Sequence, residues 1–330
     1  MIKIKDNFGR YVNYLRISIT DRCNFRCIYC GQGRDFKFLP CSEILTYEEI
    51  LRLISIGQRL GVEKVRLTGG EPFIRKGFLD FLGKVMDKFP DIDLRITTNG
   101  SLLKKHDIVK LKQIGIKAIN VSLDSFDEKK FRYITKNGNL YSVLDTIYSL
   151  IQEDIRTKIN VVVLKDINDD EVIRFANFAV NNPVDVRFIE FMDLTRDNKW
   201  NQKFFVSAKD ILSQIYKEFE LIPEILEKKT KGPARRYKIK GGKGRIGIIS
   251  PLSDHCCNRC NRFRITADGS LKTCLFAKKS YLLKGLLRNK KISDDIIVKV
   301  MLKAGERKPI GRELYLKDKC EYLGMYKVGG

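Results

Sequence analysis

The chain has 330 residues, of which 43% are hydrophobic, which suits one large α/β domain with a smaller appendage and excludes general disorder. No apolar run reaches the ~18 residues of a membrane span and the N-terminus lacks a secretory signal, so we expect a cytoplasmic protein with no membrane partner. The net charge of +23 favours anionic partners, but it is spread along the chain and does not choose between a nucleotide and an RNA.

Short β-branched runs alternate with helical patterns up to about residue 220. The expected strands are, in chain order, Leu15–Ile19, Lys64–Thr68, Leu94–Thr97, Ile119–Leu123, Asn160–Leu164 and Val186–Phe191. Between the first two strands we predict a helix over Tyr47–Leu60, which begins with a capping box of Thr46 and Glu49. Strands separated by helices predict right-handed βαβ units and a parallel sheet, either open or curved into an incomplete barrel. Reactive groups should then lie at the C-terminal ends of the strands.

The pattern changes near residue 225, where glycines mark loops. Arg236–Lys240 and Arg245–Ile249 predict one hairpin, and Phe263–Thr266 and Leu271–Leu275 predict another that turns at Asp268-Gly269. We therefore expect a larger domain over residues 1–225 and a small C-terminal module over residues 226–330.

The first cysteine triplet follows the first expected strand. Nine cysteines are unusual for a cytosolic chain and indicate metal binding or catalysis. Cys23, Cys27 and Cys30 have the spacing Cys-x3-Cys-x2-Cys, which can hold three irons of a four-iron cluster and leave the fourth open to a small molecule. A structural zinc site is the alternative, but zinc prefers four ligands, and His106 and His255 are remote in sequence.

This triplet is the motif of the radical S-adenosylmethionine (SAM) superfamily, which the sequence resembles. Gly69-Gly70-Glu71-Pro72 ends the second expected strand, where glycine lets backbone carbonyls approach a ligand closely. Thr97-Thr98-Asn99-Gly100 and Ser122-Leu123-Asp124 end the next two strands. Each stretch alone is also typical of a simple turn. The resemblance implies an α/β fold, an incomplete (β/α)6 barrel of the radical SAM type, with a small C-terminal module that binds a cluster.

A second triplet has the spacing Cys257-x2-Cys260-x13-Cys274. A zinc site is a serious alternative here, because Cys256 or His255 could complete a tetrahedral set. The stretch from Cys257 to Phe276 resembles the C-terminal signature of the GTP 3′,8-cyclase family, and so does the terminal Gly329-Gly330.

The resemblance implies a role for each matching residue. The first [4Fe-4S] cluster, which takes SAM, would be held by Cys23, Cys27 and Cys30. SAM itself would be contacted by Tyr29, Gly70, Ser122 and Met192. A second [4Fe-4S] cluster, whose open iron takes the guanine base, would be held by Cys257, Cys260 and Cys274. GTP would be bound by Arg16, Arg66, Thr97, Lys158, Arg262, Phe263 and Arg264. One departure is Cys256, an extra thiol that could close the open iron.

The implied enzyme is a lyase that converts GTP to (8S)-3′,8-cyclo-7,8-dihydroguanosine 5′-triphosphate, the first step of molybdenum cofactor biosynthesis. A radical derived from SAM would abstract the hydrogen at C3′, and the carbon radical would attack C8 of guanine. The implied partners are a reducing electron donor and the next enzyme of the pathway, cyclic pyranopterin monophosphate synthase. The chain could form a homodimer, and we expect no nucleic acid partner.

Three alternatives compete with this interpretation. A radical SAM peptide-maturing enzyme also has an auxiliary-cluster module, but usually with more cysteines than this chain has. A radical SAM RNA-modifying enzyme would suit the charge, but no RNA-binding module is recognisable. A zinc-binding interaction protein would leave the first triplet unexplained.

Overall fold

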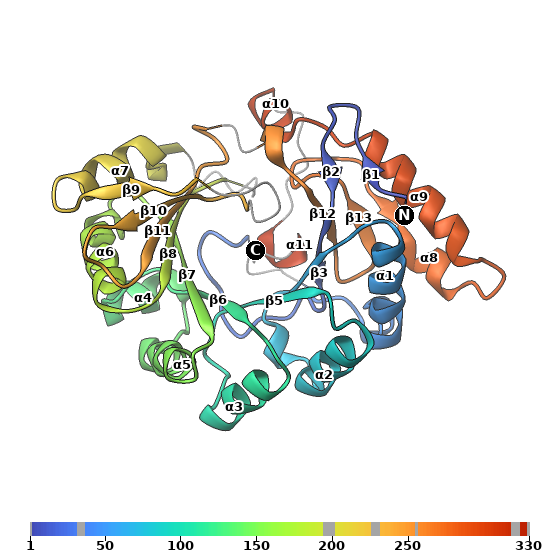
Figure 1. Cartoon of the computed structure of the whole chain (residues 1–330), viewed down its shortest axis with the longest axis horizontal. Helices are drawn as coiled ribbons and strands as arrows, with labels where there is room; N and C mark the ends of the chain where they lie inside the picture. The colour runs from blue at the N-terminus through green and yellow to red at the C-terminus, as the bar shows by residue number, and fades with distance from the viewer. Residues whose placement is uncertain are drawn as a thin grey trace. The chain divides into compact units, whose positions relative to one another are not determined.

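The computed structural model describes residues 2–31, 37–193, 202–225, 232–254, 257–317 and 324–328. Their internal contacts define two compact units, and Figure 1 labels the helices and strands of the chain. Unit 1 comprises Met1–Asn24, Cys30–Thr97 and Cys257–Gly330, and unit 2 comprises Phe25–Tyr29 and Thr98–Cys256. Both units take residues from either side of residue 225. The domain boundary expected near residue 225, between the larger domain and the small C-terminal module, stays a prediction.

Unit 1 contains a sheet with the strand order β14-β13-β12-β3-β4-β5. Its parallel strands are β3 (Tyr14–Ser18), β4 (Lys64–Thr68), β5 (Asp93–Thr98) and β12 (Arg262–Ile265), which pairs with β3. The antiparallel strands β13 (Ser270–Lys272) and β14 (Tyr281–Leu282) extend this edge. A separate two-stranded sheet is formed by β1 (Ile4–Lys5) and β2 (Tyr11–Val12). The helices of this unit are α1 (Tyr47–Arg59), α2 (Phe78–Lys88), α8 (Leu283–Arg288), α9 (Asp294–Glu306), α10 (Gly311–Leu316) and α11 (Met325–Val328).

Unit 2 has a sheet of matching design, with the strand order β6-β7-β8-β11-β10-β9. Its parallel strands are β6 (Ala118–Ser122), β7 (Arg156–Val163), β8 (Asp185–Glu190) and β11 (Arg245–Ile249). The antiparallel strands β10 (Arg235–Ile239) and β9 (Leu221–Pro223) follow. Its helices are α3 (Lys105–Gln113), α4 (Glu128–Thr135), α5 (Leu140–Gln152), α6 (Val172–Asn181) and α7 (Ala208–Tyr216).

The elements expected from the sequence form at their predicted places. All six predicted strands are present as β3 to β8, and both predicted hairpins form as β10–β11 and β12–β13. The capping box of α1 is complete, since Glu49 N donates to Thr46 Oγ1 at 3.2 Å and Thr46 N donates to Glu49 Oε2 at 2.7 Å. The mixed α/β class with parallel strands is therefore confirmed. Among the described residues, no helix has the length and apolar character to cross a membrane.

One strand of each predicted hairpin also pairs with a parallel strand of its unit. The first strand of the C-terminal hairpin, β12, joins the parallel strands of unit 1 beside β3, although their sequences lie far apart. In unit 2, β11 likewise pairs in parallel with β8. The segment around the second cysteine triplet is thus tied by backbone hydrogen bonds to the strand that leads into the first triplet.

Candidate active site

The backbone that leads into Cys23 lies against the Gly69–Pro72 turn in unit 1. Gly70 N donates to Thr20 O at 2.8 Å, and Glu71 N donates to Arg22 O at 2.7 Å. A Cβ atom on Gly70 would overlap the Arg22 carbonyl oxygen. The close approach of the cysteine loop is therefore one reason for a glycine at this position. Contact of Gly70 with SAM stays a prediction.

The middle of the same loop belongs to unit 2, where the end of α4 holds it. Arg26 N donates to Thr135 O at 3.0 Å and Ile28 N donates to Ile134 O at 2.9 Å. These two bonds fix the backbone on both sides of Cys27. Cys23 and Cys30 belong to unit 1, and Cys27 belongs to unit 2.

Tyr29 is anchored within unit 2 by a buried carboxylate. Its Oη donates to Asp124 Oδ2 at 2.6 Å, and Val162 N donates to Asp124 Oδ1 at 2.8 Å. Asn168 Nδ2 donates to the Asp124 carbonyl at 2.6 Å. Burial raises the pKa of Asp124 to about 6, against the lowering effect of the two bonds to its carboxylate. Asp124 was expected only as a polar strand-end residue, and its bond to Tyr29 was not foreseen.

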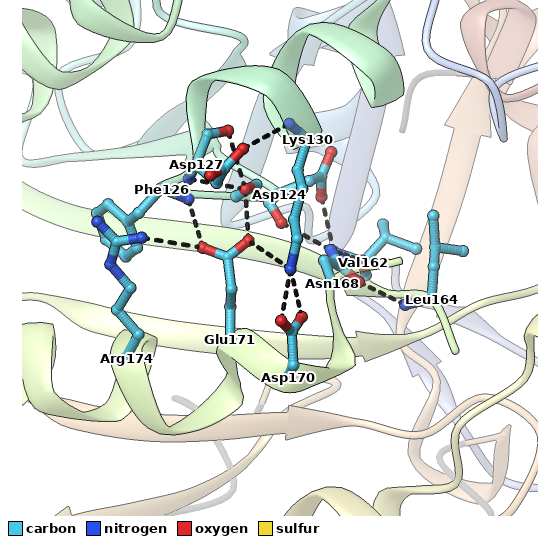
Figure 2. A network of polar contacts seen from close by, with 11 residues as sticks. Asp124, Phe126, Asp127, Lys130, Val162, Leu164, Asn168, Asp170, Glu171 and Arg174 are labelled. Carbon is cyan, nitrogen blue, oxygen red and sulfur yellow. Dashed lines mark hydrogen bonds and ion pairs between the residues drawn. The ribbon is translucent and has the colours of Figure 1, made fainter. Parts of the chain in front are cut away.

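A network of polar contacts continues from Asp124 to the start of α4 (Figure 2). Glu171 is buried and accepts hydrogen bonds from Ser125 Oγ and, at 2.8 Å, from Phe126 N. Lys130 on α4 donates to both carboxylate oxygens of Asp170, at 2.7 and 2.5 Å. The network therefore fixes the segment between β6 and α4, the helix whose end holds the cysteine loop.

Three of the arginines expected to bind GTP lie in one row across neighbouring strands of unit 1, and Arg95 on β5, which pairs with Asp93, continues the row beyond Arg66. The parallel register places Arg264 on β12 opposite Arg16 on β3, and Arg16 opposite Arg66 on β4. Residues in register on neighbouring strands project from the same face of a sheet. Arg66 Nη1 donates to Thr97 Oγ1 at 3.0 Å, and Arg66 Nε donates to Tyr14 Oη at 2.6 Å. The structure thus brings together four of the seven expected GTP-binding residues.

The electrostatics of this row show a concentration of positive charge. Burial and the neighbouring Arg264 lower the pKa of Arg16, while burial and Arg262 lower the pKa of Arg264 to about 10. Burial would raise the pKa of Tyr14, but Arg66, Arg16 and Arg262 outweigh it and bring that pKa to about 7. Guanidinium groups bind phosphate oxygens in pairs, so this face fits a polyphosphate.

Of the other expected GTP-binding residues, Phe263 belongs to β12 in unit 1 and Lys158 belongs to unit 2. Phe263 alternates with Arg262 and Arg264 along β12, so its fully buried side chain projects from the opposite face of the sheet. The binding of GTP by Phe263 stays a prediction. Lys158 is buried on β7 in unit 2, opposite Asn120 on β6.

Unit 2 carries a second polar row, which sequence reasoning missed except for Ser122. Asn160 on β7 lies opposite Ser122 on β6 and Arg187 on β8. The Oδ1 atoms of Asn160 and of the neighbouring Asn120 are buried without a hydrogen-bond donor among the described residues. A buried amide oxygen of this kind costs free energy unless a ligand or water satisfies it. Met192 follows the end of β8 and is half-buried.

The second triplet lies in unit 1, where Cys257 and Cys260 precede β12 and Cys274 follows β13. Burial raises the pKa of Cys260, but Lys308 and Arg262 outweigh it and lower that pKa to about 6. Burial raises the pKa of Cys274, against the lowering effect of Lys308, and electrostatic repulsion from Cys260 and Cys257 adds to the increase. His255 and Cys256, which could complete a zinc site, lie outside the described residues.

The C-terminal helix α11 touches both the first triplet and the arginine row. Met325 N donates to Cys30 O at 3.0 Å, and Arg264 Nη1 donates to Val328 O at 3.3 Å. Gly329-Gly330 lie outside the described residues. The chain end leading to them is therefore held beside two groups of expected site residues.

The sequence matches two family profiles and many full-length relatives. The profile described as Radical SAM superfamily matches residues 17–179, and that described as Molybdenum Cofactor Synthesis C matches residues 184–314. The GTP 3′,8-cyclase of Thermodesulfovibrio yellowstonii is 43% identical over 330 residues, which cover 99% of this chain and 100% of that protein. The chain belongs to the GTP 3′,8-cyclase family. The GTP 3′,8-cyclase of Clostridium perfringens strain SM101 is 39% identical over 329 residues, again covering 99% and 100%.

The solved structure of Streptococcus suis SuiB bound to SAM has a similar fold. Its TM-score is 0.64 at 14% identity, covering 87% of this chain and 68% of SuiB, and the likeness concerns the fold alone. Membership of the GTP 3′,8-cyclase family makes the chain a radical SAM enzyme of molybdenum cofactor biosynthesis and implies a [4Fe-4S] cluster and SAM as cofactors. The expected family, fold class and enzyme class are confirmed.

The donor sets of this family member fit the implied groups. Three cysteines on one short loop could supply one thiolate each to three irons and would leave one iron open. Among the described residues, no three His, Cys, Asp or Glu side chains surround a point where one metal ion could bind. In a four-iron cluster each thiolate binds a different iron, so the cysteine sulfurs lie farther apart than the ligands of a single metal ion.

Proposed function

We propose that this chain converts GTP to (8S)-3′,8-cyclo-7,8-dihydroguanosine 5′-triphosphate with two [4Fe-4S] clusters and SAM. The observation that supports this most is the arginine row of Arg16, Arg66 and Arg264, which lies on the strands next to the second cysteine triplet. Burial of several guanidinium groups together is costly, and an anion with about four charges such as GTP would offset that cost.

Cys23, Cys27 and Cys30 would hold the cluster that binds SAM, and Tyr29, Gly70, Ser122 and Met192 would contact SAM. When bound, SAM and this cluster supply the radical that removes the hydrogen atom from C3′ of GTP. Asp124 holds Tyr29 through its hydroxyl, and Asn160 and Asn120 offer amide oxygens to a bound ligand. These groups bind and orient SAM and exclude water from it.

Cys257, Cys260 and Cys274 would hold the second cluster. Its neighbours Arg262 and Arg264 project from the same face of β12, because they alternate with Phe263. With Arg16, Arg66, Thr97 and Lys158 they would hold the triphosphate and ribose of GTP. Arg66 is fixed by Tyr14, Ile96 O and Thr97, so its guanidinium is oriented before the substrate arrives. The reaction requires a reducing electron donor, and the next enzyme of the pathway would take the product.

The test is anaerobic reconstitution followed by an iron count and a turnover assay. We expect about eight irons per chain, and 5′-deoxyadenosine together with the cyclic product when SAM, dithionite and GTP are present. GTP should be required for product, and ATP should not replace it. About four irons, bound zinc, or 5′-deoxyadenosine formed only with a peptide or an RNA would reject the proposal.

A further inference from the structure

A buried lysine holds the backbone beside two cysteines of the second triplet. The Lys308 side chain is among the largest fully buried ones in the protein, with 1% of the residue exposed. Its Nζ donates to Arg262 O at 2.9 Å and to Thr273 O at 2.5 Å. Arg262 follows Cys260 by two residues, and Thr273 directly precedes Cys274. One ammonium group therefore joins the two segments that carry these cysteines.

The buried side chain of Arg10 holds the backbone of the third cysteine, Cys257. Arg10 Nη1 donates to Cys257 O at 2.7 Å, and Arg10 Nη2 donates to Lys308 O and Pro309 O, both at 3.0 Å. Arg10 is itself held by an ion pair with buried Asp6, in the turn between β1 and β2. The N-terminal hairpin thereby connects Cys257 to the segment that carries Lys308.

The charge of Lys308 is not balanced in the way that the charge of Arg10 is. Arg10 has the Asp6 carboxylate, whereas the two acceptors of Lys308 are neutral carbonyls, and no carboxylate in the described part of the chain forms an ion pair with it. Burying an ammonium group next to neutral oxygens is costly. Three thiolates and the cluster they hold would supply the missing negative charge at this place.

We propose that Lys308 and Arg10 are positioning residues of the second cluster, which fix the three cysteine segments, and that the Lys308 charge raises the reduction potential of that cluster. The inference rests on the proposed function, which assigns Cys257, Cys260 and Cys274 as its ligands. A fixed positive charge stabilises the more negative, reduced state of a cluster, and net charge is one of the factors that set its potential. Partners of the ligands outside the cluster are also known to control how firmly a metal site is held.

The experiment uses the full-length chain with Cys23→Ala, Cys27→Ala and Cys30→Ala, so that only the second cluster can form. This parent should bind about four irons, and a parent without iron would reject the proposed second cluster itself. Lys308→Met is then compared with Lys308→Arg and with Lys303→Met, a control for an exposed lysine on α9. The readouts are iron per chain and the midpoint potential from a dithionite titration followed by electron paramagnetic resonance.

We expect Lys308→Met to lose iron, or to keep it with a midpoint potential shifted to more negative values, while Lys308→Arg and Lys303→Met stay close to the parent. If Lys308→Met keeps both the iron and the midpoint potential of the parent, the inference is wrong. Damage of equal size in Lys308→Arg would also overturn it, because charge would then not be the cause. If Lys308→Met does not fold, Arg10→Gln decides: loss of iron supports the inference, and full occupancy overturns it.

Discussion

Tyr29 Oη donates a hydrogen bond of 2.6 Å to Asp124 Oδ2, which joins the residue before the last cysteine of the first triplet to the end of β6. Asp124 is buried and also accepts a bond from Val162 N. A single carboxylate thus connects the loop of the first cysteine triplet to two neighbouring strands of unit 2. Its protonation should affect the stability of the fold.

The first prediction concerns the pH dependence that Asp124 causes. Its pKa of about 6 in the folded chain exceeds the ordinary value of about 3.9 in an unfolded one. A raised pKa means that the stability this group contributes is fully present below about pH 4 and is lost as the pH rises through about 6. Relative to Asp124→Asn, the native chain should lose on the order of 2–3 kcal/mol between pH 4 and pH 7.

Urea unfolding of the cluster-free chain at a series of pH values measures this difference. Asp154→Asn is the control, because Asp154 is exposed and should give a curve parallel to that of the native chain. A difference between native and Asp124→Asn chains that stays constant from pH 4 to pH 7 would contradict the buried, raised pKa.

The second prediction concerns Gly70→Ala. The added methyl group would overlap the Arg22 carbonyl oxygen, so the backbone before Cys23 must move. Overpacking of this kind typically costs about 1–3 kcal/mol, and here it should also reduce iron by up to about four per chain. Gly83→Ala in α2 is the matched control, because a Cβ at Gly83 meets no atom within 4 Å. Equal iron contents in the two variants would show that the turn does not hold the loop.

The periodicity of apolar residues and the turn residues predicted most strands and hairpins of the fold, but they did not predict the tertiary contacts of single residues. The apolar runs gave β3 to β8 because buried parallel strands leave a clear pattern. The family resemblance assigned Arg16, Arg66 and Arg264 to one GTP site, but their arrangement as a row depends on the pairing of β12 with β3 and on its register, which the sequence does not show. Phe263 is different: strand alternation alone places it on the face opposite Arg262 and Arg264, a signal that was available in the sequence.

The residues that sequence reasoning missed lie outside any motif. Lys308 and Arg10 are single cations among 63 Lys and Arg, and only their burial and carbonyl partners distinguish them. Asn160 begins an apolar run that was predicted to form a buried strand. A polar residue on such a strand was the signal that could have indicated a binding role. Burial depends on tertiary packing, which local patterns do not encode.

The third prediction separates GTP binding from SAM cleavage. Arg264→Ala removes one member of the arginine row, so it should lower GTP affinity by about 10-fold or more, since charged hydrogen bonds contribute roughly 1.5–3 kcal/mol. SAM cleavage without GTP should keep the native rate. Arg59→Ala is the control, because Arg59 is exposed on α1 and its partner Asp295 is exposed as well. Calorimetric titration with GTP and a 5′-deoxyadenosine assay measure the two effects; equal loss of both would mean that Arg264 acts on the SAM site.

The fourth prediction concerns Tyr14, whose hydroxyl lies beside Arg66 and whose pKa is lowered to about 7. The cause that lowers it is the positive charge of Arg66, Arg16 and Arg262, which outweighs burial. Stability from this group is present at high pH, above the ordinary value of about 10, and is lost as the pH falls through about 7. The triphosphate of GTP would neutralise the same arginines, so binding should raise the pKa of Tyr14 again and protonate it.

Tyrosinate absorbance follows this change directly. At about pH 8, the ligand-free chain should show a tyrosinate band that disappears on addition of GTP, with uptake of a proton by the protein. Tyr14→Phe should lack the band, and Tyr11→Phe, which changes an exposed tyrosine of β2, should retain it. Guanosine has no phosphate and should leave the band in place. A band that GTP does not alter would mean that the triphosphate is not bound at the arginine row.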